Sequence, residues 1–171
     1  MKILGKHGYV RDVVDSDIIE LSLNPRSVDS RHSDYLGWPN HEKHVYETFD
    51  RSIRTISFCL KDETYIGSTG VAHSPQERIG QVWVLGSRNS LDMIKSKSDF
   101  FKSFGNLKAM FAVYEFMRIS REHFDWLFGE EFDHLVNIVE ADNSLGIRWL
   151  KFMGGKIEPI DDKYSKVIFS K

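Results

Sequence analysis

The segment from His134 to Ile157 constrains the fold most, because a strand, a capped helix and a glycine stop follow one another directly in it. Leu135 to Val139 is a short apolar run rich in β-branched residues, which is typical of a buried strand. Asp142, Asn143 and Ser144 then offer side-chain oxygens suited to capping a helix. The segment therefore predicts a strand that leads directly into a helix.

The helix is expected to lay one apolar face on a sheet. Apolar side chains recur near helical spacing at Leu145, Trp149, Phe152 and Met153. Gly154 and Gly155 should end the helix, because glycine reaches the left-handed backbone conformation without steric cost. The chain can then turn at once into a further strand at Lys156 to Glu158.

The spacing of five residues in this segment matches a known pattern. Val139 and Asn143 stand four apart, and the small residue Gly146, then Trp149 and Gly154, follow them. This series resembles the last signature motif of the GNAT superfamily of N-acetyltransferases, which reads roughly V-x-x-x-N-x-x-A-x-x-L-Y-x-K-x-G-F. Trp149 takes the place of the leucine. The resemblance implies a GNAT-like mixed β-sheet flanked by helices.

Two positions depart from that motif. Leu150 stands where many active members carry a tyrosine that acts as general acid, and Gly155 replaces the phenylalanine. The resemblance therefore supports the fold better than it supports the chemistry.

Composition limits the classes of function. With 171 residues and 41% hydrophobic content, a single domain over residues 1–171 with its own core is expected. A net charge of −2 gives no basic surface for nucleic acid. No apolar run approaches the roughly 20 residues that cross a bilayer, so an intracellular protein without a membrane partner is expected. Cys59 is the sole cysteine, and its apolar neighbours predict a buried side chain.

The order of the remaining elements predicts an α+β fold. We expect strands at Tyr9–Val14, Thr55–Lys61, Tyr65–Ala72, Gln81–Gly86 and Tyr164–Ser170, and helices from Asp15 to Leu23, His41 to Ile53 and Ala109 to Phe128. The three middle strands should be antiparallel neighbours, and Gly67 and Gly70 within them indicate a bulge or a close backbone approach. This order resembles the GNAT order over essentially the whole chain.

Two of the histidines are weak metal candidates. His41 and His44 share a helix face, but they lack the spacing of a metalloprotease motif and a further set of ligands, so no metal is expected.

The end of the third middle strand bears on cofactor binding. The GNAT resemblance implies a Q/R-x-x-G-x-G/A loop there, whose backbone N–H groups hold the pyrophosphate of acyl-coenzyme A. The chain has Ser87, Arg88, Asn89 and Ser90 instead, and no glycine follows Gly86 until Gly105. Ser87, Arg88 and Asn89 remain candidate cofactor-binding residues. The alternative is that this sequence is an ordinary cap between a strand and a helix.

Within the GNAT resemblance, three short motifs point to one particular set of proteins. Gly70-Val71, Trp83-Val84-Leu85 and Ile147-Arg148-Trp149-Leu150 followed by Gly154 resemble small tailed-phage proteins labelled internal virion or morphogenesis protein. That resemblance implies phage or host proteins as partners. It also implies the host-cell cytoplasm as location, with association with the virion as an alternative.

Two main functions stay open. In the first, the protein has lost acyl transfer and acts in virion morphogenesis or as a protein-binding module, because the phosphate loop is degenerate. In the second, it is an active acyl-CoA-dependent N-acyltransferase with acetyl-CoA as cofactor. Glu140 is then the candidate acid or base, and Asn143 a cofactor contact. A third, weaker alternative is binding of a host factor that the protein inhibits or redirects.

Overall fold

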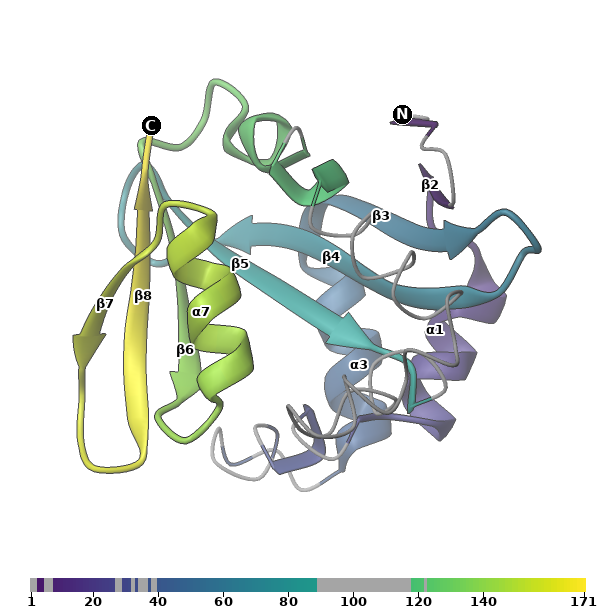
Figure 1. The fold of residues 1–171 in the computed structure, drawn as a ribbon, viewed down its shortest axis with the longest axis horizontal. Helices are drawn as coiled ribbons and strands as arrows, with labels where there is room; N and C mark the ends of the chain where they lie inside the picture. Colours follow the sequence, from purple (N-terminus) through teal and green to yellow (C-terminus); the bar gives the residue numbers. More distant parts are fainter. Residues whose placement is uncertain are drawn as a thin grey trace.

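A mixed sheet of eight strands forms the centre of the protein (Figure 1). The computed structural model describes residues 3–4, 8–26, 29–31, 33, 37, 40–88, 118–121 and 123–171. Along the sheet the strands follow the order β1-β2-β3-β4-β5-β6-β8-β7. Their bounds are Ile3–Leu4 (β1), Gly8–Arg11 (β2), Ser52–Leu60 (β3), Tyr65–His73 (β4), Ile79–Gly86 (β5), His134–Glu140 (β6), Lys156–Pro159 (β7) and Tyr164–Ser170 (β8).

Helices cover both faces of the sheet. The described helices are α1 (Asp15–Leu23), α3 (His41–Asp50) and α7 (Ser144–Phe152), with further helical residues at 29–31, 33, 88, 118–121 and 123–128. Neighbouring residues of β5 point to opposite faces. Trp83 accordingly packs with α1 and α3, whereas Val82 packs with α7 and residues 123–128. The α+β class expected from the sequence is confirmed.

The three middle strands are antiparallel neighbours, as predicted. A Cβ atom on Gly67 would lie 2.4 Å from the Leu85 carbonyl oxygen, and one on Gly70 would lie 2.6 Å from the Trp83 ring. The register between β3 and β4 also shifts beside Gly67, between Phe58 and Cys59. Both glycines therefore allow the close approach that their place inside a strand predicted.

Strands β5 and β6 are parallel and separate along their length. They pair only over Ile79↔His134, Gly80↔Leu135 and Gln81↔Val136. Beyond these pairs β5 remains paired with β4 to Gly86, and β6 remains paired with β8 to Glu140. The two strands diverge toward their carboxyl ends (Figure 1). We call the region between Val82–Gly86 and Asn137–Glu140 the wedge.

Several predicted boundaries are wrong at the ends of elements. The first predicted strand ends at Arg11 rather than Val14, because Val14 is the N-cap of α1 and its N–H donates to Asp17. Helix α3 ends at Asp50, so Ile53 belongs to β3 and is exposed instead of lying on a buried helix face. Local periodicity did not show where the helix gives way to the strand.

The buried face of α7 also differs from the prediction. Leu150 and Met153 are buried, whereas Phe152 is 50% exposed. Leu150 and Met153 are three residues apart and share one face of the helix. Phe152, two residues after Leu150, lies off that face and is turned toward solvent. The expected helix at 109–128 lies outside the described residues up to 117, and its described part buries Phe124 and Leu127 as predicted.

The described helices are all too short or too polar to cross a lipid bilayer.

Candidate functional site

The predicted site residues lie at the carboxyl ends of β5 and β6. Glu140 is the last residue of β6, and Asn143 follows it at the start of α7. Ser87 and Arg88 follow the last residue of β5. Because the two strands are parallel, both ends lie at the same edge of the sheet. Asn89, the remaining candidate, lies outside the described residues.

The backbone amides at the end of β5 already have partners. The N–H of Gly86 donates to Asp29 Oδ2 at 3.0 Å. The N–H of Ser87 donates to the Ile66 carbonyl at 3.0 Å, and that of Arg88 donates to the Asn24 carbonyl at 2.9 Å. The Ser87 hydroxyl also donates, to Glu20 Oε1 at 2.9 Å. These three successive amides are therefore used within the protein and do not face an open anion site.

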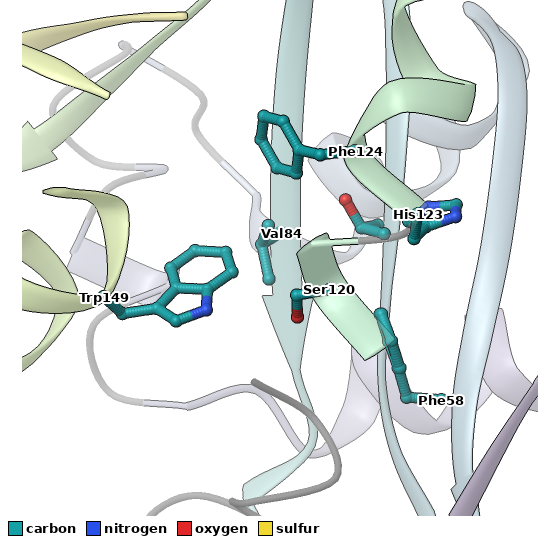
Figure 2. A pocket seen from close by; sticks show the side chains of 7 residues that line it. Phe58, Val84, Ser120, His123, Phe124 and Trp149 are labelled. Carbon is teal, nitrogen blue, oxygen red and sulfur yellow. The ribbon is translucent and has the colours of Figure 1, made fainter. Parts of the chain in front are cut away.

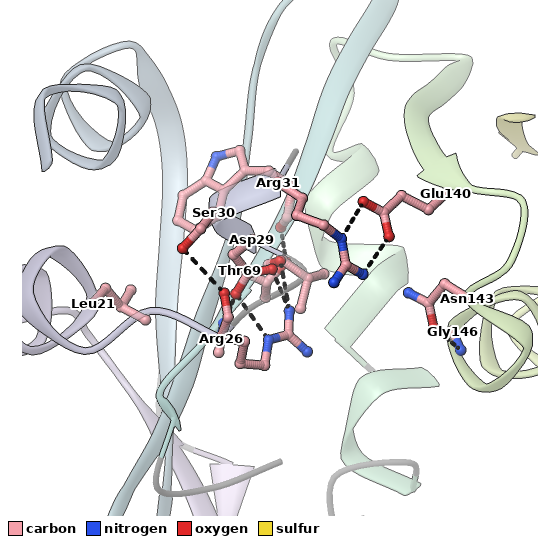
Figure 3. Close-up of polar contacts among 12 residues, drawn as sticks. Leu21, Arg26, Asp29, Ser30, Arg31, Thr69, Glu140, Asn143 and Gly146 are labelled. Carbon is pink, nitrogen blue, oxygen red and sulfur yellow. Dashed lines mark hydrogen bonds and ion pairs between the residues drawn. The ribbon is translucent and has the colours of Figure 1, made fainter. Parts of the chain in front are cut away.

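Glu140 is a buried carboxylate held by an arginine. The Glu140 residue is only 8% exposed. Arg31 donates to it through Nε at 3.0 Å and through Nη2 at 2.7 Å, which is a bidentate ion pair (Figure 3). The hydrogen bond to Glu140 raises the pKa of Arg31. The ion pair uses one acceptor site of each carboxylate oxygen, and the acid or base role of Glu140 stays a prediction.

Asn143 is the N-cap of α7, as its oxygen-bearing side chain predicted. Its Oδ1 accepts the N–H of Gly146 at 2.9 Å. A Cβ atom at position 146 would lie 2.6 Å from Asn143 Nδ2, which explains the small residue at this place in the motif. Leu150, at the motif's tyrosine position, is buried in the apolar core. In this structure Asn143 thus caps the start of α7, and Leu150 packs the helix onto the core.

A segment before α3 joins the two strand ends. We call its described residues, Pro25, Arg26, 29–31 and 33, the strap. Pro25 forms an isolated antiparallel bridge with Ser87, and the Arg26 N–H donates to the Gly86 carbonyl at 3.3 Å. The Arg26 Nη2 donates to the Val84 carbonyl at 3.4 Å. The strap therefore bonds to β5 through Arg26 and Asp29 and to β6 through Arg31.

Buried polar contacts hold the strap in shape. Asp29, only 6% exposed, accepts from Arg26 Nε and Nη2, both at 2.8 Å. The Ser33 hydroxyl lies 3.1 Å from the Asp29 carbonyl, 2.9 Å from His41 Nδ1 and 2.6 Å from His44 Nδ1. The two histidines that were weighed as metal ligands thus contact the strap. No group of three metal-ligating side chains is found within the part of the chain that the structure describes.

Sequence reasoning missed the strap. Three of its contacts join residues 57, 58 and 109 positions apart, which no local pattern in the sequence shows. The only local signal is the row of charged residues Arg26, Asp29 and Arg31, which a solvated loop would explain equally well.

Large side chains fill the wall of the wedge. Trp149 reaches from α7 toward Val84 of β5 (Figure 2). Between them lies a cavity of about 10 Å³, also lined by Phe58, Thr69, Ser120, His123 and Phe124. That volume is roughly what one water molecule needs. A tryptophan at the motif's leucine position therefore leaves little room beside β5.

His123 is a buried histidine on this wall. It is 1% exposed, and neither ring nitrogen has a hydrogen-bond partner among the described residues. Its ring lies 4.9 Å from the Trp126 ring and 6.1 Å from the Phe58 ring, between centroids. Burial lowers the pKa of His123 to about 3, so the imidazole is neutral at neutral pH.

Cys59 is buried, as predicted, and burial raises the pKa of its thiol. The neutral thiol is a poor nucleophile.

The sequence matches no protein-family model and no curated protein. Solved structures nevertheless share its fold over almost the whole chain. An acetyltransferase from Agrobacterium tumefaciens superposes with a TM-score of 0.63 at 14% identity, covering 100% of this chain and 95% of its own. The GNAT domain of Streptomyces lividans PAT gives 0.60 at 11% identity, covering 100% and 96%.

A third similar structure is Campylobacter jejuni N-acetyltransferase PseH in complex with acetyl coenzyme A. It gives a TM-score of 0.50 at 11% identity, covering 96% of this chain and 99% of its own. At such identities the likeness shows the fold alone. The protein therefore has the fold of the GNAT acetyltransferases, as the signature segment predicted.

The described end of β5 offers no open backbone donors for the pyrophosphate of acetyl-CoA. The amides of Gly86, Ser87 and Arg88 are bonded within the protein, and the Val84 carbonyl accepts from Arg26. The cavity between Val84 and Trp149 has about the volume of one water molecule, far less than a thioester arm occupies.

Proposed function

We propose that this protein uses the GNAT fold as a protein-binding module and does not transfer acyl groups. The observation that carries the proposal is the strap, because it bonds to the ends of both wedge strands at once. Asp29 holds the Gly86 amide of β5, and Arg31 holds the Glu140 carboxylate of β6. A coenzyme and an acceptor amine would have to compete with both contacts.

The burial of these contacts supports the proposal further. Asp29 and Glu140 are 6% and 8% exposed, and each accepts two hydrogen bonds from an arginine. Removing one partner of a buried ion pair costs several kcal/mol, about 3–5 in measured cases, although Arg31 is half exposed and its pair is worth less. These contacts hold the strap against the ends of both strands.

The resemblance to tailed-phage proteins suggests virion morphogenesis as the process. Partners are then phage or host proteins, in the cytoplasm of the host cell or in the particle. Mass spectrometry of purified particles tests this role. A constant copy number per particle, together with defective assembly when the gene is deleted, is expected. Intact, infectious particles formed without the gene would contradict it.

The second candidate is an acyl-CoA-dependent N-acyltransferase with a divergent coenzyme site. It is favoured by the diverging parallel strands and by the acetyl coenzyme A complex of the similar PseH structure. In this case the strap must move, and Arg88, which follows Ser87 directly after β5, is a candidate cation for the phosphate position.

Isothermal titration with acetyl-CoA separates the two candidates. The protein-binding proposal predicts no heat of binding up to about millimolar coenzyme. Micromolar affinity that is lost in Arg88→Ala, but kept in Arg51→Ala, would overturn it and support the acyltransferase. Arg51 is a suitable control because its guanidinium is exposed and it precedes β3. There it lies at the opposite end of strands β3 to β5 from Gly86.

A further inference from the structure

The strap bonds to one particular edge of β5. The groups that it contacts are the N–H and carbonyl of Gly86 and the carbonyl of Val84. Backbone groups of residues two apart point to the same edge of a strand. Because β4 lies along the other edge of β5 as far as Gly86, these groups point into the wedge.

At Pro25 and Arg26 the strap contacts this edge in the manner of an added strand, whereas its residues 29–31 and 33 are helical. Pro25 and Ser87 form an antiparallel bridge, and the Arg26 N–H donates to the Gly86 carbonyl as in a β-ladder. Side chains then replace the next backbone partners, because Asp29 accepts the Gly86 N–H and the Arg26 guanidinium donates to the Val84 carbonyl. A part of the chain therefore already occupies an edge on which a sheet takes up peptides.

A missing side chain lets the strap lie so close. A Cβ atom on Gly86 would lie 2.5 Å from Arg26 Nε and 2.7 Å from Arg26 Cδ. Glycine at this position thus makes room for a neighbouring segment beside the strand. A larger residue there would displace the Arg26 side chain.

We propose that the wedge is a peptide-binding groove and that the strap is its intramolecular occupant. The partner is a segment of another protein that displaces the strap and, as Pro25 and Arg26 do, pairs with the Val84–Gly86 edge of β5. Its chemistry follows from the contacts that it must replace: a carboxylate for the Gly86 N–H and an arginine for Glu140. This inference rests on the proposed function and specifies where the protein-binding module takes its partner.

A peptide with the strap sequence, residues 24–33 (NPRSVDSRHS), is the probe. In the wild-type protein the tethered strap competes at an effective concentration on the order of millimolar, so the free peptide should not bind measurably. In the variant Asp29→Ala/Arg31→Gln the tethered copy is weakened. Fluorescence anisotropy should then show the labelled peptide binding at least about tenfold more tightly than to wild type.

The control peptide carries Asn and Gln in place of the residues that correspond to Asp29 and Arg31, and it should bind more weakly. Amide hydrogen exchange at Gly86 gives a second readout. Faster exchange in the variant, reversed by adding the strap peptide, is expected. Circular dichroism must show that the variant keeps its fold; if it does not, Arg31→Gln alone is used with the same readouts.

Two results would overturn the inference. One is a folded variant with faster Gly86 exchange that does not bind the strap peptide. The other is a variant that binds acetyl-CoA instead of the peptide, which assigns the groove to the coenzyme. Failure of the proposed function is distinct, because it appears as acetyl-CoA binding by the wild-type protein.

Discussion

At the level of single residues, Asn143 tests whether a signature residue has a chemical or a structural role. Its side chain caps α7 through the Gly146 N–H. We predict that Asn143→Ala lowers the free energy of unfolding by about 1 kcal/mol and that Asn143→Asp largely restores it, because aspartate caps equally well. Urea denaturation at neutral pH measures both. Equal losses in the two variants would contradict a capping role.

His123 should make stability depend on pH. Its folded pKa of about 3 lies below the ordinary value of 6.5, so the unfolded chain takes up a proton that the folded chain excludes. Stability is therefore fully present above about pH 6.5 and falls as the pH drops toward 3, by at most about 1.4 kcal/mol per pH unit. We predict a shallower fall for His123→Phe, which keeps a ring between Phe58 and Trp126.

Urea denaturation of both proteins at pH 7, 5.5 and 4.5 checks this prediction. Comparing the two isolates His123 from the other titrating groups. At pH 7 the variant should be at least as stable, since it removes two buried nitrogens without hydrogen-bond partners among the described residues. Parallel curves for the two proteins would show that His123 does not cause the acid sensitivity.

The role of a residue could be predicted from the sequence where that residue acts on its neighbours along the chain. Asn143 caps a helix three residues ahead, and Gly154 has the positive φ of 93° that its position after the helix required. Glu140 was chosen as a candidate for its position after a strand, but its partner Arg31 lies 109 residues away. Nothing near Glu140 in the sequence indicates that pair.

At the level of elements, Gly86 couples the end of β5 to the strap. We predict that Gly86→Ala displaces the Arg26 side chain and raises amide exchange at residues 29–31 by about tenfold, the equivalent of one lost charge-assisted hydrogen bond. Arg26→Ala should give a similar rise. The double variant should add little, because both changes break the same contact. Fully additive increases would mean that Gly86 and Arg26 act separately.

Element boundaries followed from the sequence where strong turn residues flank them. The last strand was predicted residue for residue as Tyr164–Ser170, and α1 ends at Leu23 before Asn24-Pro25 as expected. The rotation of α7 was not predictable, because both Phe152 and Leu150 are apolar and only the sheet beneath decides which one is buried. The strap was missed for a related reason, since its contacts with β5 and β6 are tertiary.

At the level of the whole molecule, the sheet has a narrow junction. Strands β1–β5 join β6–β8 within the sheet through three residue pairs only. Gly80 lies in that junction, and a Cβ atom there would lie 2.7 Å from Leu135 Cδ2 and 2.7 Å from Val71 Cγ2. Close packing of this kind leaves no room for a methyl group without movement of its neighbours.

We predict that Gly80→Ala destabilises the protein by about 1–3 kcal/mol, as overpacked cores do. Gln81→Ala is the matched control, because its side chain is exposed at the next position of the same pairing. Thermal unfolding followed by tryptophan fluorescence and by circular dichroism measures both variants. A variant as stable as the control would show that the junction tolerates a methyl group.

The outer strands of the sheet have a consequence for behaviour at high concentration. The outer strands are short: β1 has two residues, and β7 has four and ends in Pro159. Short edges and proline discourage strand addition between molecules. The longer stretch that could template aggregation lies inside, along β5, where Arg26 and Asp29 cover it. Loosening the strap should therefore cost solubility before it costs stability, and light scattering would detect this first.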